Sequence, residues 1–216
     1  MDLQPTGVSP NPGDPRRSGG WRGRRAAIFA FLRRHSATTE QLARRFFGGS
    51  SPGAKKKASR WLVKQRRRGR IRVVGVVQRR DNGRPEHVYG RRCPMNMVEH
   101  EVMVAEAEIL LGVELSRDAK VGRTEADAKM ERDGIPFWAE VDNTGHMTAA
   151  QMEAKWKRYE GADGFILIIA TSETRMQRLR AGAGTVKEKA FFTTFERLRS
   201  GEEKPWLDFD GNPVSI

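Results

Sequence analysis

Residues 124–142 read TEADAKMERDGIPFWAEVD, and this stretch decides the fold of the carboxy-terminal half of the chain. Two strand-like runs, 124–131 and 135–142, flank Arg132-Asp133-Gly134, a sequence typical of a β-hairpin turn. Because successive residues of a strand point to opposite faces, the apolar residues of the second run share one face. Glu140 and Asp142 share the other face.

Further elements follow on both sides of this hairpin. Residues 97–111 repeat apolar residues at helical spacing, and Thr148 begins a T-x-x-Q capping box at the start of a helix over 148–159. GFILIIA (164–170) is a continuous apolar run, as expected of a strand buried on both faces. Another helix and a strand at 191–195 complete the order α-β-β-β-α-β-α-β, which predicts an α/β layer fold.

Four residues in these elements are candidates for chemistry. Asp127 lies on the first hairpin strand, and a tight hairpin brings it near Glu140. Clustered carboxylates repel one another unless a proton or cation neutralises them, and oxygen ligands suit Mg²⁺ or Mn²⁺. Lys155 lies on the inward face of the helix 148–159, where a lysine is costly unless its ammonium reaches an anion. We therefore predict a catalytic site of Asp127, Glu140, Asp142 and Lys155, with Asp127 and Glu140 binding the metal. The alternative is a solvated strand edge with a lysine that extends to water.

The amino-terminal half shows a different pattern. Apolar residues at helical spacing in 21–35 predict one helix, a T-x-x-Q box at Thr38 begins a second, and Ser51-Pro52 begins a third. The run 71–80, an Asp-Asn-Gly turn and the run 85–90 predict a hairpin. Three helices followed by a hairpin is the order of a winged helix-turn-helix, in which the third helix enters the major groove.

Charge divides the chain in the same place. Residues 1–93 hold 24 Lys and Arg against 5 Asp and Glu, an excess of +19, whereas residues 94–216 hold 16 against 22. A strongly basic half predicts a module that binds a polyanion. The residues that we expect to bind double-stranded DNA lie on the third helix and in the hairpin: Lys55, Lys56, Lys57, Arg60, Lys64, Arg67, Arg79, Arg80 and Arg84. An RNA-binding module is the less favoured alternative.

Composition argues against several other classes. No apolar run reaches the ~18 residues of a membrane span, and the one cysteine, Cys93, excludes a disulfide framework. The Pro- and Gly-rich residues 1–20 predict a disordered arm rather than a signal peptide. We therefore expect a cytoplasmic protein with no membrane partner. The predicted organisation is an arm (1–20), a winged-helix domain (21–93), an α/β domain (97–200) and a tail (201–216).

Three stretches of the second half resemble the PD-(D/E)XK nuclease superfamily: ADAKMERDGIPFWAEVDNTG (126–145), MEAKWKRY (152–159) and GFILIIATSETRMQRLRAG (164–182). With the hairpin that ends GRPEHVYG (83–90), the chain is similar to the replication-relaxation family of plasmid and mobile-element proteins. The resemblance covers roughly residues 21–195. It implies a winged helix followed by an α-β-β-β-α-β core with a Mg²⁺-dependent phosphodiesterase site.

Within this resemblance, Asp127 matches the motif aspartate, with Ala126 in place of the usual proline, and Glu140 matches the second acid. Asp142 occupies the position of the motif lysine, so Lys155 would supply the amine from the adjacent helix.

The first helix of the predicted core holds further polar residues. By the same resemblance, Glu101 or Glu106 would add an acid of the kind that some members of the superfamily use. His100, at the start of this helix, is interpreted as structural.

Two functions are consistent with these patterns. The first is a metal-dependent DNA endonuclease or nickase in plasmid or mobile-element DNA processing. The second is a non-catalytic DNA-binding protein, either a replication or mobilisation accessory factor or a transcriptional regulator. A homodimer and a protein partner in a DNA-processing complex both remain open.

Overall fold

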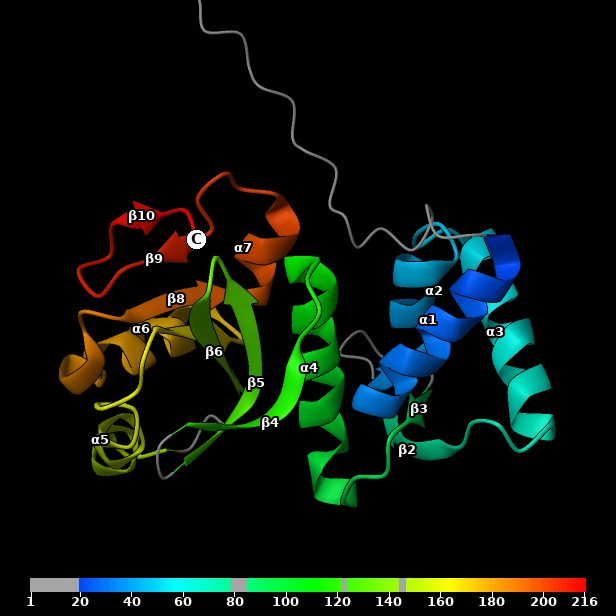
Figure 1. Cartoon of the computed structure of the whole chain (residues 1–216), viewed down its shortest axis with the longest axis horizontal. Coiled ribbons are helices and arrows are strands. Elements are labelled where there is room, and N and C mark those ends of the chain that lie inside the picture. Colours follow the sequence, from blue (N-terminus) through cyan, green and yellow to red (C-terminus); the bar gives the residue numbers. More distant parts are fainter. Residues whose placement is uncertain (1–19, 79–84, 122–123, 144–146) are drawn as a thin grey trace, which may run out of the picture.

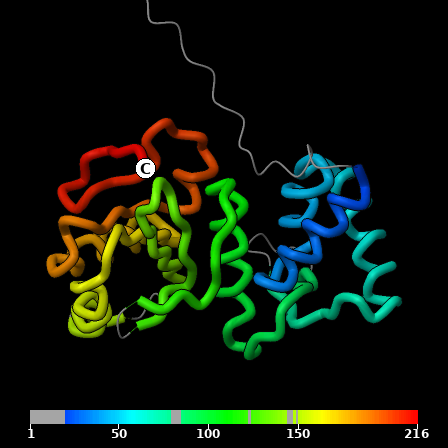
Figure 2. Tube along the Cα trace, viewed as in Figure 1, coloured from blue at the N-terminus to red at the C-terminus, as the bar shows by residue number. Residues whose placement is uncertain are grey.

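The first helix forms where the apolar spacing predicts it. A computed structural model describes residues 20–78, 85–121, 124–143 and 147–216 (Figure 1, Figure 2). Helix α1 (Gly20–Arg34) buries Ile28, Phe31 and Leu32, the three residues expected to face the core. The predicted arm lies outside the described residues except for Gly20, which begins α1.

Two further helices begin at the predicted capping residues. Helix α2 (Thr39–Phe46) follows Thr38, whose hydroxyl accepts a hydrogen bond from the backbone N–H of Gln41, while the Gln41 side chain accepts one from the Thr38 N–H. Helix α3 (Pro52–Arg67) follows Ser51, with a proline at its first position. Both capping predictions are confirmed.

A three-stranded sheet packs against these helices. Strand β2 (Val73–Val77) and strand β3 (Glu86–Gly90) form the predicted antiparallel pair, whose connection at 79–84 lies outside the described residues. Strand β1 (Ser36–Thr38), which the sequence analysis did not predict, pairs with β3 to give the order β1-β3-β2. Gly90 permits this pairing, because a Cβ at this position would lie 2.2 Å from the backbone oxygen of His35.

The carboxy-terminal half contains a seven-stranded sheet and follows the predicted element order. Its elements are η1 (Met95–Met97), α4 (Val98–Leu111), β4 (Ser116–Val121), β5 (Thr124–Arg132), β6 (Ile135–Asp142), α5 (Ala149–Lys157), β7 (Phe165–Ala170), α6 (Glu173–Ala181), η2 (Gly184–Val186), β8 (Ala190–Thr194), α7 (Phe195–Ser200), β9 (Trp206–Leu207) and β10 (Pro213–Val214). The strand order is β10-β9-β8-β7-β6-β5-β4. Strands β6, β7 and β8 run parallel, and the other neighbours are antiparallel. The turn after β5 is the predicted one, with left-handed φ angles of 53° at Asp133 and 77° at Gly134.

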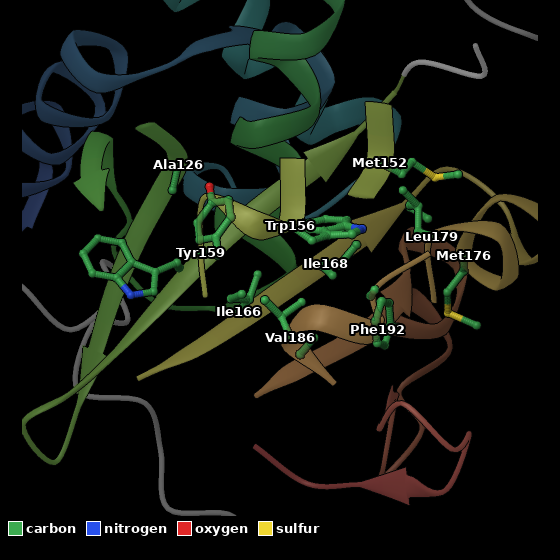
Figure 3. Close-up of a cluster of buried hydrophobic side chains, with 14 of the residues drawn as sticks. Ala126, Met152, Trp156, Tyr159, Ile166, Ile168, Met176, Leu179, Val186 and Phe192 are labelled. Atoms are coloured by element: carbon green, nitrogen blue, oxygen red, sulfur yellow. The ribbon is translucent and has the colours of Figure 1, made fainter. Parts of the chain in front are cut away.

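Each face of this sheet has its own core. Trp156 lies with Ile166 and Ile168 on the side of α5 and α6 (Figure 3). Leu167 and Ile169, the intervening residues of β7, belong to the core on the side of α4 and α7. Strand β7 is therefore buried on both faces, as its continuous apolar run predicts.

Helix α4 lies between the two sheets (Figure 1). Its Val104 belongs to a core of the seven-stranded sheet, whereas Ala105 belongs to the core of the amino-terminal helices. A helix buried on two sides must neutralise its charged residues. Glu106 accordingly accepts hydrogen bonds from Arg44 of α2 and from Arg199 of α7.

The carboxy-terminal segment completes the sheet. Strands β9 and β10 extend it beyond β8, and Trp206 is 4% exposed in the core on the α4 side. The predicted tail (201–216) therefore docks on the core rather than projecting from it.

The described residues together form a mixed α/β structure with seven α-helices and ten strands in two sheets. This confirms the predicted α/β class. Among these helices, none is both long enough and apolar enough to cross a membrane.

Candidate active site and nucleic-acid interface

Asp127 lies at an irregular point of β5. Ala126 and Ala128 belong to the cores on opposite faces of the sheet, although residues two apart in a regular strand share a face. On the neighbouring strand β4, Asp118 has a left-handed φ of 51° and interrupts the pairing at this point. Such irregularities turn a side chain out of its regular direction. The Asp127 carboxylate thereby accepts a hydrogen bond from the backbone N–H of Val141, at 2.8 Å.

Glu140 meets two side chains from the α5 region. Lys155 Nζ lies 2.7 Å from Glu140 Oε2, and the Tyr159 hydroxyl donates a hydrogen bond to Glu140 Oε1. The Glu140 side chain is 6% exposed and that of Lys155 is 25% exposed, so the pair lies just below the surface. Figure 3 shows the Tyr159 hydroxyl turned toward Ala126 on β5. The side chains of Lys155 and Tyr159 therefore meet Glu140 near the end of β6.

Asp127 is also held by the start of α4. His100 Nε2 lies 2.8 Å from Asp127 Oδ1, and Arg117 donates a hydrogen bond to the Asp127 backbone oxygen at 2.5 Å. Arg117 pairs in addition with Glu101 at 2.6 Å. The structure thus ties Glu101 to Arg117 and Glu106 to arginines of α2 and α7, and brings His100 rather than either glutamate to Asp127.

The two acids of this site differ in their affinity for a proton. Burial raises the pKa of Glu140, and the negative charge of Asp127 adds to this rise against the opposing charge of Lys155. Burial also acts to raise the pKa of Asp127, but His100, the Val141 N–H and Lys155 together outweigh it and lower that pKa. Glu140 is therefore the acid that takes up a proton more readily.

The remaining titratable groups of the site bind their protons more tightly than usual. Burial acts to lower the pKa of Lys155, but attraction to Glu140 and Asp127 outweighs it and raises that pKa. The pKa of His100 is raised in the same way, because its contact with Asp127 outweighs burial. The hydroxyl of Tyr159 has a raised pKa from burial and from the charge of Glu140, so it stays protonated and donates.

Asp142 follows Glu140 on the same face of β6 but pairs with a different helix. Arg175 of α6 binds it in a bidentate manner, with Nε 3.1 Å from Oδ1 and Nη2 2.8 Å from Oδ2. Both side chains are buried, at 7% and 2% exposure. Asp142 is therefore part of a buried ion pair with α6, whereas Lys155 is the ammonium beside Glu140.

A pocket of about 400 Å³ opens beside the Glu140–Lys155 pair. Its lining residues come from β5, β6 and α5 with their flanking segments: Thr124, Glu125, Glu140, Met147, Gln151, Ala154, Lys155 and Arg158. Lys155 and Arg158 contribute two positive charges to the lining, and Glu125 and Glu140 contribute two carboxylates. A phosphate group entering this pocket would meet both cations.

The carboxylates suit a hard cation that keeps most of its water. Among the described residues, no group of three or more His, Cys, Asp or Glu side chains is arranged to hold a metal ion. Mg²⁺ commonly uses only one or two carboxylates, with waters and substrate phosphate oxygens completing its coordination. Each oxygen of Asp127 and Glu140 accepts one hydrogen bond or ion pair and keeps a second lone pair. Asp127 and Glu140 are therefore the residues whose oxygens such an ion would use.

The exposed face of α3 is basic. Ala58, Trp61 and Leu62 are buried as predicted, and Lys55 lies 3.0 Å from Glu40 of α2. The remaining basic residues predicted for this helix are exposed: Lys56, Lys57, Arg60, Lys64 and Arg67. The predicted hairpin residues Arg79, Arg80 and Arg84 lie outside the described residues.

Tyr159 and Arg175 were not predicted as site residues, and His100 was interpreted as structural without a partner. Tyr159 had a usable signal, because it follows Lys155 by four residues and so shares its helical face. His100 lies 27 residues before Asp127, and Arg175 lies 33 residues after Asp142. These two contacts depend on how α4 and α6 pack over the sheet, so no local sequence pattern predicts them.

Comparisons with protein-family models, with curated protein sequences and with solved structures found no match for this chain. The site geometry and the charge distribution therefore carry the functional argument.

Proposed function

We propose that this chain is a DNA-binding protein whose carboxy-terminal half hydrolyses DNA phosphodiester bonds with Mg²⁺ or Mn²⁺, as an endonuclease or nickase. The observation that carries the proposal is the convergence of two acids and one lysine from three elements. Lys155 Nζ is 2.7 Å from Glu140, and Asp127 binds the N–H of Val141, the residue after Glu140. Acid pairs beside a lysine and a pocket are suited to phosphoryl chemistry.

The amino-terminal elements support DNA binding. Their order α1-β1-α2-α3-β2-β3 supports a winged helix, in which α3 would enter the major groove and the β2–β3 connection would form the wing. Five basic residues on the exposed face of α3 would neutralise phosphates there, and such contacts supply most of the affinity for duplex DNA.

The carboxy-terminal elements support the nuclease assignment. The order α4-β4-β5-β6-α5-β7, with acids on β5 and β6 and the lysine on α5, supports this assignment, because a PD-(D/E)XK core would have the order α-β-β-β-α-β. The proposed membership in the replication-relaxation family, and with it a role in plasmid or mobile-element DNA processing, rests on the sequence stretches quoted above.

Each residue of the site would have its own role in hydrolysis. Asp127 and Glu140 would hold the metal ion, which when bound lowers the pKa of a coordinated water and stabilises charge on the phosphate. Lys155 is partly exposed to the pocket, so its ammonium can turn from Glu140 to a phosphate oxygen. Tyr159 and His100 are positioning residues, because each holds one oxygen of a metal-binding acid.

Asp142 has a supporting role in this proposal. Its bidentate pair with Arg175 fixes the end of β6 against α6. We therefore assign Asp142 to positioning rather than to contact with the substrate.

A non-catalytic DNA-binding factor is the second candidate, and the completeness of the ion pairs favours it. Every carboxylate oxygen of Asp127 and Glu140 already has a protein partner. Lys155, Tyr159 and His100 could therefore serve only to stabilise a fold that docks a second copy or another protein of a DNA-processing complex.

The two candidate functions are separated by incubating the full chain with supercoiled plasmid and about 5 mM Mg²⁺ or Mn²⁺. We expect nicked plasmid from the native chain and none from Glu140→Gln or Lys155→Met, with duplex binding retained in EDTA. Lys157→Met is the matched control, because Lys157 lies on the same helix, is 59% exposed and pairs with Glu153 on the surface. A folded native chain that binds duplex DNA but leaves it intact with both metals would refute the nuclease proposal.

A further inference from the structure

A second pocket lies on the amino-terminal half. It measures about 440 Å³ and is formed by the end of α1, the start of β2 and the end of β3. Phe29, Leu32 and Ile71 give it an apolar floor. Five arginines complete its lining: Arg33, Arg70, Arg72, Arg91 and Arg92. We call this the arginine pocket.

The described residues leave most of the charge of the arginine pocket without a neutralising ion pair. Within the described residues, Arg91 pairs with Asp118 at 2.5 Å, whereas no ion pair to a carboxylate is present for the other four arginines. Arg33 lies at the carboxy-terminal end of α1, where the helix dipole favours a cation. Arg70, Arg72 and Arg92 have no such compensation and are exposed.

Like charges from three separate chain segments repel one another when they line one pocket. Guanidinium groups bind phosphate through paired N–H donors, and their stems cover the apolar floor. A ligand with phosphate groups and an apolar sugar face would match both properties. The backbone of a nucleic acid strand is such a ligand.

The location of the arginine pocket links it to both halves of the proposed function. Arg70 follows α3 by three residues, so the chain that leaves this helix lines the pocket. Arg91 binds Asp118 on β4, which places the pocket beside the edge of the seven-stranded sheet. Lys120 is exposed and lies two residues after Asp118 on β4, a distance of about 7 Å along a strand. In the β4–β5 ladder Lys120 lies opposite Glu125. Glu125 lines the pocket beside Glu140 and Lys155.

We propose that the arginine pocket binds the phosphate backbone of a DNA strand and guides that strand along β4 from α3 to the carboxylate site. This inference rests on the proposed function and adds a substrate path to it. Arg33, Arg70, Arg72 and Arg92 contact the phosphates, and Arg91 anchors the pocket to the carboxy-terminal half through Asp118.

Binding of a fluorescent duplex in EDTA tests this path, because no cleavage then complicates the measurement. The test variant is the triple change Arg70→Gln, Arg72→Gln and Arg92→Gln in the full chain. The matched control removes three exposed positive charges from the other half: Arg132→Gln, Lys187→Gln and Lys204→Gln. Circular dichroism and thermal unfolding establish that both triple variants fold.

The salt dependence of affinity gives the quantitative readout. Each phosphate contact contributes about 0.9 to the slope of log affinity against log salt. We expect the arginine-pocket variant to lose about 2–3 from this slope and at least about tenfold in affinity at low salt, while the control changes the slope by less than about 1.

Two further samples separate this inference from the proposed function. A variant with Lys56→Gln, Arg60→Gln and Lys64→Gln on α3 tests duplex binding itself. If that variant loses affinity and the arginine-pocket variant keeps the native slope, the strand path is wrong and the DNA-binding proposal stands. If neither variant changes the affinity for the duplex, the strand path and the DNA-binding proposal are both wrong. Competition with deoxyadenosine monophosphate is the last arm, and tight binding of it to the pocket without an effect on the duplex slope would show a small-molecule phosphate site instead.

Discussion

Replacing Lys155 by methionine should destabilise the protein through Glu140 rather than through lost packing. Methionine preserves most of the aliphatic stem but leaves the Glu140 carboxylate, 6% exposed, without its ammonium partner at 2.7 Å. Removing one member of a buried ion pair costs about 3–5 kcal/mol. Because Lys155 itself is 25% exposed, we expect the low end, about 3 kcal/mol, or a fall in Tm of about 6–12 °C for a chain of this size.

The reverse change should cost less. In Glu140→Gln the ammonium of Lys155 can turn to water in the adjacent pocket, and the repulsion between Glu140 and Asp127 is removed. We expect a loss of about 1 kcal/mol, as for partly exposed pairs. The double variant should then be more stable than Lys155→Met alone, with a coupling of about 2 kcal/mol in a double-mutant cycle.

Urea unfolding followed by tryptophan fluorescence at pH 7.5 and pH 5 tests this reasoning. Without Lys155 the folded-state pKa of Glu140 lies further above its unfolded value. The cost of the substitution therefore develops as pH rises above about 4.3 and is smaller at pH 5. Lys157→Met, on the exposed face of the same helix, should change stability by less than about 0.5 kcal/mol. The role of the Glu140–Lys155 pair would be refuted if the losses of unfolding free energy in the two single variants were additive in the double variant. It would also be refuted if Lys155→Met lowered the unfolding free energy equally at both pH values.

Three further changes test other parts of the structure. Gly90→Ala should cost about 3 kcal/mol by thermal unfolding, because its Cβ would lie 2.2 Å from a backbone oxygen at a φ of 138°; a loss below about 1 kcal/mol would contradict the close pairing of β1 and β3. His35 is fully buried beside Glu108, and burial lowers its pKa, so the unfolded chain binds more protons and urea stability should fall as pH drops below about 6.5. His35→Gln should flatten that dependence, and a native chain that becomes more stable on acidification would show the opposite sign. Arg175→Met should destabilise by about 3 kcal/mol, since it removes the guanidinium from the buried Asp142 carboxylate, and chemical denaturation that shows no loss would contradict this.

Local signals account for most of the elements that the sequence analysis predicted. The capping boxes at Thr38 and Thr148 act within three residues, and the turn at Asp133-Gly134 needs only its own left-handed φ angles. The continuous apolar run of β7 predicts burial on both faces regardless of neighbours. Strand β1 was missed because three residues between two helices show no alternation, and its pairing with β3 spans about fifty residues.

The candidate site was predictable to the extent that strand and helix periodicity determine it. Alternation places Glu140 and Asp142 on one face, and helical spacing turns Lys155 toward that face. Periodicity does not tell which acid receives the lysine. The packing of α5 and α6 decides this, giving Lys155 to Glu140 and Arg175 to Asp142. The position of Asp127 likewise depends on an irregularity in β5 that a regular alternation pattern does not contain.

The two ion pairs of Glu106 on α4 bear on the distance along DNA between the sequence that is recognised and the bond that is cut under the proposed function. Arg44 of α2 and Arg199 of α7 bind the same carboxylate, so the helix that precedes α3 and the end of the large sheet are fastened to one point. A nuclease with a flexible linker cuts over a range of distances from its recognition sequence. Under the proposed function, a chain held in this way would keep a constant number of base pairs between the bound sequence and the cut.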